Sequence, residues 1–261
     1  MRALALLFAM ALPAAAQTAL EVDVELALMV DVSRSMAPSE IEIQRRGYAE
    51  AIRSPEVMAA VEGGLLGQVA LTYIEWAGDG ATRVIAPWTI ITSPAEAEAF
   101  ASMIDESFGT GMRRTSISGA ITLAADSIAS NPYEGLRRVI DISGDGPNNS
   151  GAPVTQSRDA ALRRGLTING LPLMTRDGRH QTWDIDHLDA YYRDCVIGGM
   201  GAFVIPVTDW AGFETAVRRK LVLEIAGLTP PAPTRLQKAQ MTDCLIGEKI
   251  RQERRRYWED Q

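Results

Sequence analysis

Apolar and β-branched residues recur in short runs along the chain, and stretches with a helical pattern separate most of these runs. Residues 24–33 (VELALMVDVS) are almost continuously apolar from Leu26 to Val30, as expected for a central strand that is buried on both faces. Four further runs predict parallel strands over residues 68–77, 136–146, 166–174 and 201–207. Strands that alternate with helices favour a parallel sheet covered on both faces, with right-handed crossovers.

One more strand is expected to run in the opposite direction at an edge of the sheet. The segment GDG at 78–80 follows the second strand and leads into TRVIAPWTII at 82–91. Asp-Gly favours a tight hairpin turn, and Pro87 suits an edge strand because it has no backbone N–H to donate. The pattern therefore predicts an α/β fold, namely a doubly wound, mostly parallel sheet with one antiparallel edge strand.

The intervening segments carry helix-start signals. Ser39 and Glu42 form the S-x-x-E pattern of a capping box, and Ile41, Tyr48 and Ile52 can share one face of the helix that follows. Further helices are predicted over residues 93–107, 116–130, 153–165, 184–197 and 210–227. A C-terminal helix is expected after the stiff, Pro-rich segment TPPAPT at 229–234.

The N-terminus has the features of an export signal. Met1-Arg2 gives a positive start, residues 3–12 are apolar, and the small residues of PAAAQ offer a cleavage point after Ala16. The apolar run is shorter than the roughly 20 residues that a membrane-spanning helix needs, and no later stretch reaches that length. We therefore predict a signal peptide over residues 1–16, with a buried N-terminal strand or helix as the alternative. The protein is expected to be periplasmic or secreted, without a transmembrane segment.

Length and composition fit one sizeable domain with additions. The chain has 261 residues, of which 46% are hydrophobic and 23% charged. We assign residues 22–227 to the domain and 228–261 to a Pro-rich linker and the C-terminal helix. The net charge of −7 disfavours nonspecific binding to nucleic acid, which needs a basic field.

The chain has two cysteines, Cys195 and Cys244, which fit an oxidising compartment. They allow a single intrachain disulfide. Two buried thiols are the alternative, because the sequence does not show whether the two Cα atoms lie close enough for a bond.

Candidate site residues follow two of the predicted strands or precede a helix. Asp31, Ser33 and Ser35 come directly after the first strand, Asp145 ends the strand over 136–146, and Thr115 lies just before a helix. In open α/β sheets, ligands collect at the carboxyl ends of the strands, so these loops are expected to converge. Hydroxyl and carboxylate oxygens are hard ligands, suited to Mg²⁺, Mn²⁺ or Ca²⁺.

This pattern resembles a known family. D-x-S-x-S after a buried strand, a Thr in a second loop and an Asp in a third loop look like the metal-ion-dependent adhesion site (MIDAS) of von Willebrand factor A (vWA) domains. The resemblance implies that Ser33, Ser35 and Thr115 ligate Mg²⁺ through their hydroxyls, while Asp31 and Asp145 act directly or through water. It also implies that an acidic side chain of a protein or peptide partner completes the metal shell. The segments YIEW, SGDGPNN and YYRDCVIGG further resemble a group of exported bacterial vWA-like proteins without a settled function.

Two of these features allow a second interpretation. D-x-S-x-S alone could be helix-cap chemistry. Arg113 and Arg114 flank Thr115 and could attract an acidic ligand, or they could be an ordinary solvated pair.

Three functions compete: a metal-dependent binding module, a Mg²⁺-dependent phosphatase-like hydrolase, and a structural domain in which a metal staples the loops. Haloacid-dehalogenase-type phosphatases require the motif D-x-D after the first strand, but here Ser33 stands in place of the second aspartate. A serine hydrolase would need a nucleophile elbow and a matched histidine, and neither is present. We therefore expect a binding module and not an enzyme.

Overall fold

The computed structural model describes residues 19–107, 109–175, 185–231 and 242–259. Five strands form one sheet in the order β3-β2-β1-β4-β5. All neighbouring strands are parallel except β2 and β3, which are antiparallel. The strands are β1 (Leu20–Asp31), β2 (Val69–Trp76), β3 (Thr82–Ile91), β4 (Tyr133–Gly144) and β5 (Thr167–Pro172). The predicted fold class is confirmed.

β1 forms the centre of the sheet because both of its faces are apolar. Every residue from Val22 to Asp31 is buried. Leu26 and Leu28 pack into one hydrophobic cluster, while Ala27 and Met29, which alternate with them, pack into the cluster on the opposite face. This alternation is the period-2 geometry of a strand.

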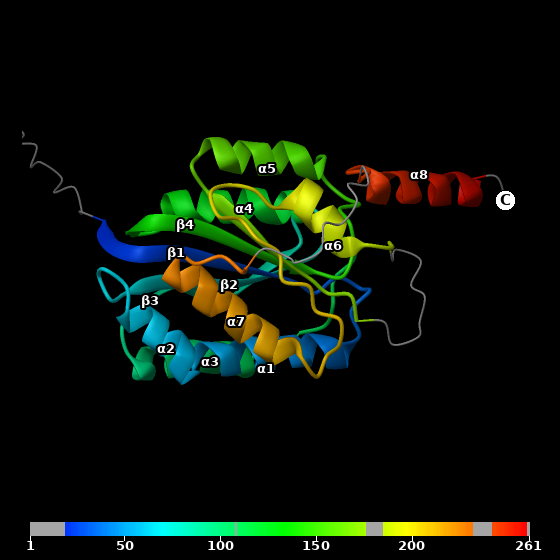
Figure 1. The fold of residues 1–261 in the computed structure, drawn as a ribbon. Coiled ribbons are helices and arrows are strands. Elements are labelled where there is room, and N and C mark those ends of the chain that lie inside the picture. Colours follow the sequence, from blue (N-terminus) through cyan, green and yellow to red (C-terminus); the bar gives the residue numbers. More distant parts are fainter. Residues whose placement is uncertain (1–18, 108, 176–184, 232–241, 260–261) are drawn as a thin grey trace, which may run out of the picture.

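Helices cover both faces of the sheet (Figure 1). On one face lie α1 (Pro38–Ile52), α2 (Pro55–Glu62), α3 (Pro94–Asp105) and α7 (Phe213–Ala226). On the other lie α4 (Ile117–Ser130), α5 (Val154–Arg163), α6 (Leu188–Tyr191) and the π-helix η1 (Tyr192–Val196). The C-terminal helix α8 (Ile246–Glu259) is present as predicted, and Figure 1 shows it extending beyond the layered body.

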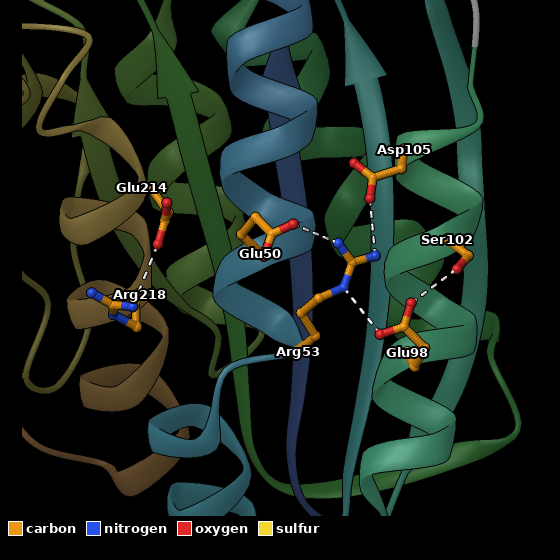
Figure 2. Close-up of polar contacts among 7 residues, drawn as sticks. All are labelled: Glu50, Arg53, Glu98, Ser102, Asp105, Glu214 and Arg218. Atoms are coloured by element: carbon orange, nitrogen blue, oxygen red, sulfur yellow. Dashed lines mark hydrogen bonds and ion pairs between the residues drawn. The ribbon is translucent and has the colours of Figure 1, made fainter.

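An ion-pair network joins α1 to α3 (Figure 2). The Arg53 guanidinium, at the end of α1, pairs with Glu50 at 2.8 Å, with Glu98 at 3.2 Å and with Asp105 at 2.9 Å. Glu98 and Asp105 belong to α3, so one side chain fixes the relative position of two helices on this face of the sheet. Arg218 of α7 pairs with Glu214 of the same helix at 3.4 Å, and it also pairs with Glu56 of α2 at 3.8 Å.

The predicted capping box of the first helix is wrong. The N-cap of α1 is Ala37, and the carboxylate of Glu40 accepts its backbone N–H at 2.6 Å. Ser39 lies inside the helix, and Glu42 pairs with Arg46 one turn further on. The helix begins at Pro38, whose missing N–H costs nothing in the first turn, and this shifts the capping positions by two residues.

The structure adds one helix and shortens another. Sequence patterns gave no helix for α2, although Ser54 caps it and Pro55 begins it, as these residue types often do. The helix predicted over 184–197 begins only at Leu188, because His187 has a left-handed backbone conformation with φ of 62°. After one turn it continues as η1.

The strand predicted over 201–207 is also a partial error. This segment runs beside β5 but forms only isolated parallel bridges, Gly170 with Val204 and Leu173 with Val207. The backbone N–H groups of Ile205 and Val207 donate to Gly170 O and Pro172 O, but Pro172 has no N–H to donate back, which interrupts the ladder.

Cys195 of η1 and Cys244, just before α8, form a disulfide with Cα atoms 5.4 Å apart, so this prediction is confirmed. The predicted signal peptide and much of the Pro-rich linker lie outside the described residues. Within the described segments, no helix is long and apolar enough to cross a membrane.

Candidate metal centre

The loop after β1 and the loop after β4 are joined by a chain of hydrogen bonds between side chains. The backbone N–H of Ser33 donates to Asp31 Oδ1 at 2.6 Å. Ser33 Oγ lies 2.8 Å from Ser35 Oγ, and Ser35 Oγ donates to Asp145 Oδ1 at 2.8 Å. Four of the five predicted site residues are therefore in direct contact, and helix capping is left to Glu40.

Register in the sheet explains why Asp31 and Asp145 meet. β1 and β4 are parallel neighbours, with Val30 opposite Ser143, so the two chains leave the sheet side by side. Gly144 directly precedes Asp145 and lies against the Asp31 side chain. A Cβ at this position would lie 2.9 Å from Asp31 Oδ2, so only glycine fits without a shift.

The loop that carries Thr115 is held against the other two by backbone contacts. The N–H of Met112 donates to Val32 O at 2.8 Å, beside the loop after β1. The N–H of Thr115 donates to Asn149 Oδ1 at 3.0 Å, and the N–H of Asn149 donates to Thr115 O at 2.9 Å. Between these contacts Arg114 has φ of 70°, an uncommon conformation for a residue with a side chain. All three loops are thus fixed relative to one another.

These loops enclose a pocket of about 250 Å³. Its lining is Ser33, Arg34, Ser35, Arg113, Arg114, Thr115, Asp145, Gly146, Asn149 and Arg251. Four predicted site residues are in the lining, while the fifth, Asp31, is fully buried and is not part of it. Arg113 and Arg114 are exposed and line the same pocket.

The Asp31 carboxylate lies in an unfavourable electrostatic environment. Burial and the nearby Asp145 carboxylate raise its pKa well above the ordinary range, although hydrogen bonds from Ser33 and Asp145 act in the opposite direction. Its Oδ2 has no hydrogen-bond partner among the described residues. A buried carboxylate oxygen without a partner costs roughly 1–3 kcal/mol.

The donor set fits a hard divalent cation. Two carboxylates with three hydroxyls supply oxygen ligands of the kind that Mg²⁺ and Ca²⁺ prefer. Among the described residues, no group of three or more His, Cys, Asp or Glu side chains could hold a metal ion instead. A cation in this pocket would also offset the repulsion between Asp31 and Asp145.

Tyr192 lies beneath the two carboxylates and was not singled out from the sequence. Burial, and then Asp31 and Asp145, raise the pKa of its hydroxyl well above the usual value. A Cβ at Gly144 would lie 2.8 Å from this hydroxyl, which shows how closely η1 approaches β4. No local pattern could have identified Tyr192, because its position depends on how η1 packs.

Two asparagines and one arginine were also missed. Asn149 fixes the Thr115 loop, and Asn148 Oδ1 accepts the N–H of Ser118 at 3.0 Å, at the start of α4. The Gly/Asn/Pro-rich composition after β4 was a usable signal for these two. Arg251 of α8 lines the pocket from a segment about 100 residues away, and no signal in the sequence places it there.

Comparison with known proteins identifies both family and fold. The family model described as "Protein of unknown function (DUF1194)" matches residues 21–229. No curated protein matches the sequence. Similar solved structures include proximal thread matrix protein 1 from the mussel byssus, with a TM-score of 0.58 and 13% identity over 80% of this chain and 49% of that chain. Another crystal structure of that protein has a zinc-occupied MIDAS motif.

Two bacterial proteins of known structure also have a similar fold. The pilus adhesin SpaC of Lactobacillus rhamnosus GG has a TM-score of 0.56 and 10% identity over 78% of this chain and 31% of that chain. A von Willebrand factor type A protein of Catenulispora acidiphila has a TM-score of 0.55 and 13% identity over 78% of this chain and 43% of that chain. This chain therefore spans less than half the length of each of these three proteins. At this identity the likeness to solved structures concerns the fold alone. The family match and this likeness together show that the chain is a member of the DUF1194 family with the fold of a vWA domain.

Proposed function

We propose that this protein is an exported, divalent-metal-dependent binding domain that recruits a protein or peptide partner through an acidic side chain. In this proposal Ser33, Ser35 and Thr115 hold the metal through hydroxyls, and Asp31 and Asp145 contribute directly or through water. The observation that carries the proposal is the hydrogen-bonded chain from Asp31 to Asp145, with a buried carboxylate oxygen that has no described partner.

The ligand chemistry explains why such a site would bind an anion. Two carboxylates and three neutral hydroxyls leave a divalent cation with little surplus negative charge around it. The metal therefore stays electrophilic and supplies a positive centre for an incoming carboxylate. Mg²⁺ is the proposed ion, with Mn²⁺ or Ca²⁺ as alternatives, because all three prefer oxygen ligands. The zinc-occupied motif of the mussel protein supports a divalent ion in general.

The pocket supports binding better than catalysis. Its lining contains no histidine, cysteine or lysine, so the usual general base and the lysine expected of a haloacid-dehalogenase-type phosphatase are both missing from it. We therefore do not expect turnover of phosphate or ester substrates with Mg²⁺. A panel of such substrates checks this point, and robust turnover that Asp31→Asn abolishes would replace binding by hydrolysis.

Isothermal titration of the mature chain with Mg²⁺, Mn²⁺ and Ca²⁺ tests the metal site. We expect binding of at least one ion at a single site, with loss of that binding in Asp31→Asn and in the Ser33→Ala/Ser35→Ala double variant. Asp126→Asn is the matched control, since Asp126 is an exposed carboxylate of α4 that pairs with Arg164. If none of the ions binds, or if the control loses as much affinity as Asp31→Asn, the proposed function is wrong.

A further inference from the structure

The C-terminal helix α8 is docked against the loop that carries Asp145. The disulfide between Cys195 and Cys244 fixes the chain immediately before the helix. In the first turn, Glu248 Oε1 accepts a hydrogen bond from Asn148 Nδ2 at 2.7 Å. One turn later, Arg251 Nη1 donates to Asn149 O at 2.9 Å. Since Asn149 also holds Thr115, α8 is connected to the candidate metal centre through a single residue.

The close approach depends on a glycine. A Cβ on Gly247 would lie 2.1 Å from the backbone oxygen of Asn148, so a larger residue could not sit at this position without moving the helix. The disulfide, the two hydrogen bonds and this contact together hold α8 so that its Arg251 is part of the pocket lining.

Four arginines from three separate segments line the pocket: Arg34, Arg113, Arg114 and Arg251, hereafter the pocket arginines. In the part of the chain that the structure describes, Arg34, Arg113 and Arg114 have no ion-pair partner, and Arg251 bonds only a backbone carbonyl. Asp145 is the one acidic residue in the lining. Arg46 and Arg218, by contrast, each pair with a carboxylate of their own helix.

This charge distribution is opposite to that of the whole molecule. The chain carries a net charge of −7, yet four arginines line a pocket of about 250 Å³. They outnumber the carboxylates Asp31 and Asp145, and a divalent cation would add to the positive excess. Like charges in a small space repel, so the arrangement is stabilised when more than one negative group enters.

We propose that the pocket binds an acidic peptide segment with at least two neighbouring carboxylates. One carboxylate is placed at the metal and the second is held by the pocket arginines, with Arg251 of α8 as the specificity-determining residue. This inference rests on the proposed metal-binding function. Guanidinium groups suit the second position because their planar donors match a carboxylate in pairs, which a lysine cannot do.

Fluorescence anisotropy with a labelled hexaglutamate peptide tests the inference. In Mg²⁺ and low salt we expect the wild type to bind hexaglutamate and not hexaglutamine. Arg251→Gln and Arg113→Gln should each weaken hexaglutamate binding by about tenfold, as loss of one well-placed charge pair does. Their Mg²⁺ affinity, measured by calorimetry, should stay at the wild-type value. Arg46→Gln is the matched control, because it removes an exposed arginine of α1 that pairs with Glu42.

The outcomes separate this inference from the metal proposal. If the wild type binds Mg²⁺ but hexaglutamate does not bind, or binds equally well to Arg251→Gln and Arg113→Gln, the role of the pocket arginines is refuted while the metal site stands. Equal binding of hexaglutamine, or an equal loss in Arg46→Gln, refutes it as well. A third outcome is that the wild type does not bind Mg²⁺ and binds hexaglutamate equally well with and without chelator. That outcome refutes the metal site, and with it the proposal that one carboxylate binds the metal while a second binds the pocket arginines.

Discussion

At the end of β1, the Asp31 carboxylate is fully buried near the carboxylate of Asp145, and the absence of a side chain at Gly144 leaves room for Asp31. Gly144→Ala would place a methyl group 2.8 Å from the Tyr192 hydroxyl and 2.9 Å from Asp31 Oδ2. We expect this overpacking to lower the free energy of unfolding by about 1–3 kcal/mol. We also expect weaker metal binding, since the Asp31 side chain must move.

Urea denaturation and calorimetric titration measure the two effects of Gly144→Ala. Gly63→Ala is a suitable control, because Gly63 has an ordinary φ of −77° at the end of α2 and its nearest neighbour to an added Cβ is 3.1 Å away. Full metal affinity in Gly144→Ala would show that Asp31 does not need its observed position.

At the scale of elements, α7 is joined to β4 and β5 by a buried charge cluster. Lys220 of α7 lies 2.6 Å from Asp141 of β4 and also pairs with Glu224. Asn169 of β5 donates to Glu224 Oε1 at 2.9 Å. One lysine faces two carboxylates, so burial, and then the charge of Asp141, raise the pKa of Glu224 to about 7.

This raised pKa predicts a pH-dependent stability. The folded protein binds the Glu224 proton more tightly than the unfolded chain does, whose ordinary pKa is 4.5. The stabilisation of the folded state by protonated Glu224 is therefore complete below pH 4.5 and is lost as the pH rises through about 7. The shift corresponds to about 3 kcal/mol. Between pH 5 and pH 8, the free energy of unfolding measured with urea should fall less in Glu224→Gln than in the wild type. An equal fall in both proteins would show that Glu224 is not the group responsible.

The position of α8 can be tested without changing any charge. Gly247→Ala introduces a Cβ against the backbone oxygen of Asn148. We expect it to undock α8, to increase hydrogen exchange in residues 246–259, and to weaken hexaglutamate binding about as much as Arg251→Gln does. Metal affinity should remain, because Arg251 is absent from the proposed ligand set.

Gln252→Ala provides the comparison for Gly247→Ala, since Gln252 is an exposed residue of the same helix. This variant should keep the wild-type affinity for the peptide. Unchanged hydrogen exchange over α8 in Gly247→Ala would mean that the helix tolerates the added methyl group in place.

At the scale of the whole molecule, the proposed metal joins three loops that come from distant parts of the chain. A metal that binds only the folded state should stabilise the entire domain, by about 2.7 kcal/mol at a concentration 100 times its dissociation constant. For a domain of this size, we expect the thermal midpoint to rise by several degrees, since each kcal/mol gives roughly 2–4 °C. Differential scanning calorimetry with metal and with chelator measures this shift.

The shift should vanish in Asp31→Asn and persist in Asp126→Asn. A large shift together with a complete lack of carboxylate binding would instead favour a metal that only staples the loops. Peptide anisotropy on the same samples therefore decides between a binding site and a structural metal.

Particular residues show where sequence patterns succeed and where they stop. The strands were predictable because burial on both faces leaves an apolar run such as Leu26 to Val30. The capping residues of α1 were predicted less accurately, because the helix begins at Pro38 and Glu40 is therefore its capping carboxylate. The parallel strand over 201–207 was predicted from its apolar residues, but Pro172 of β5 has no N–H and interrupts the hydrogen-bond ladder.

The sequence by itself determined the α/β class, the order of the strands along the chain, and the set of hydroxyls and carboxylates at strand ends. These features depend on local periodicity and on residue chemistry. Only the tertiary structure decided how Asp31, Ser35 and Asp145 touch, that Asn149 holds Thr115, and that Arg251 enters the pocket. The physical reason is that sheet register and the docking of a disulfide-linked helix are long-range contacts, which no local stretch of sequence encodes.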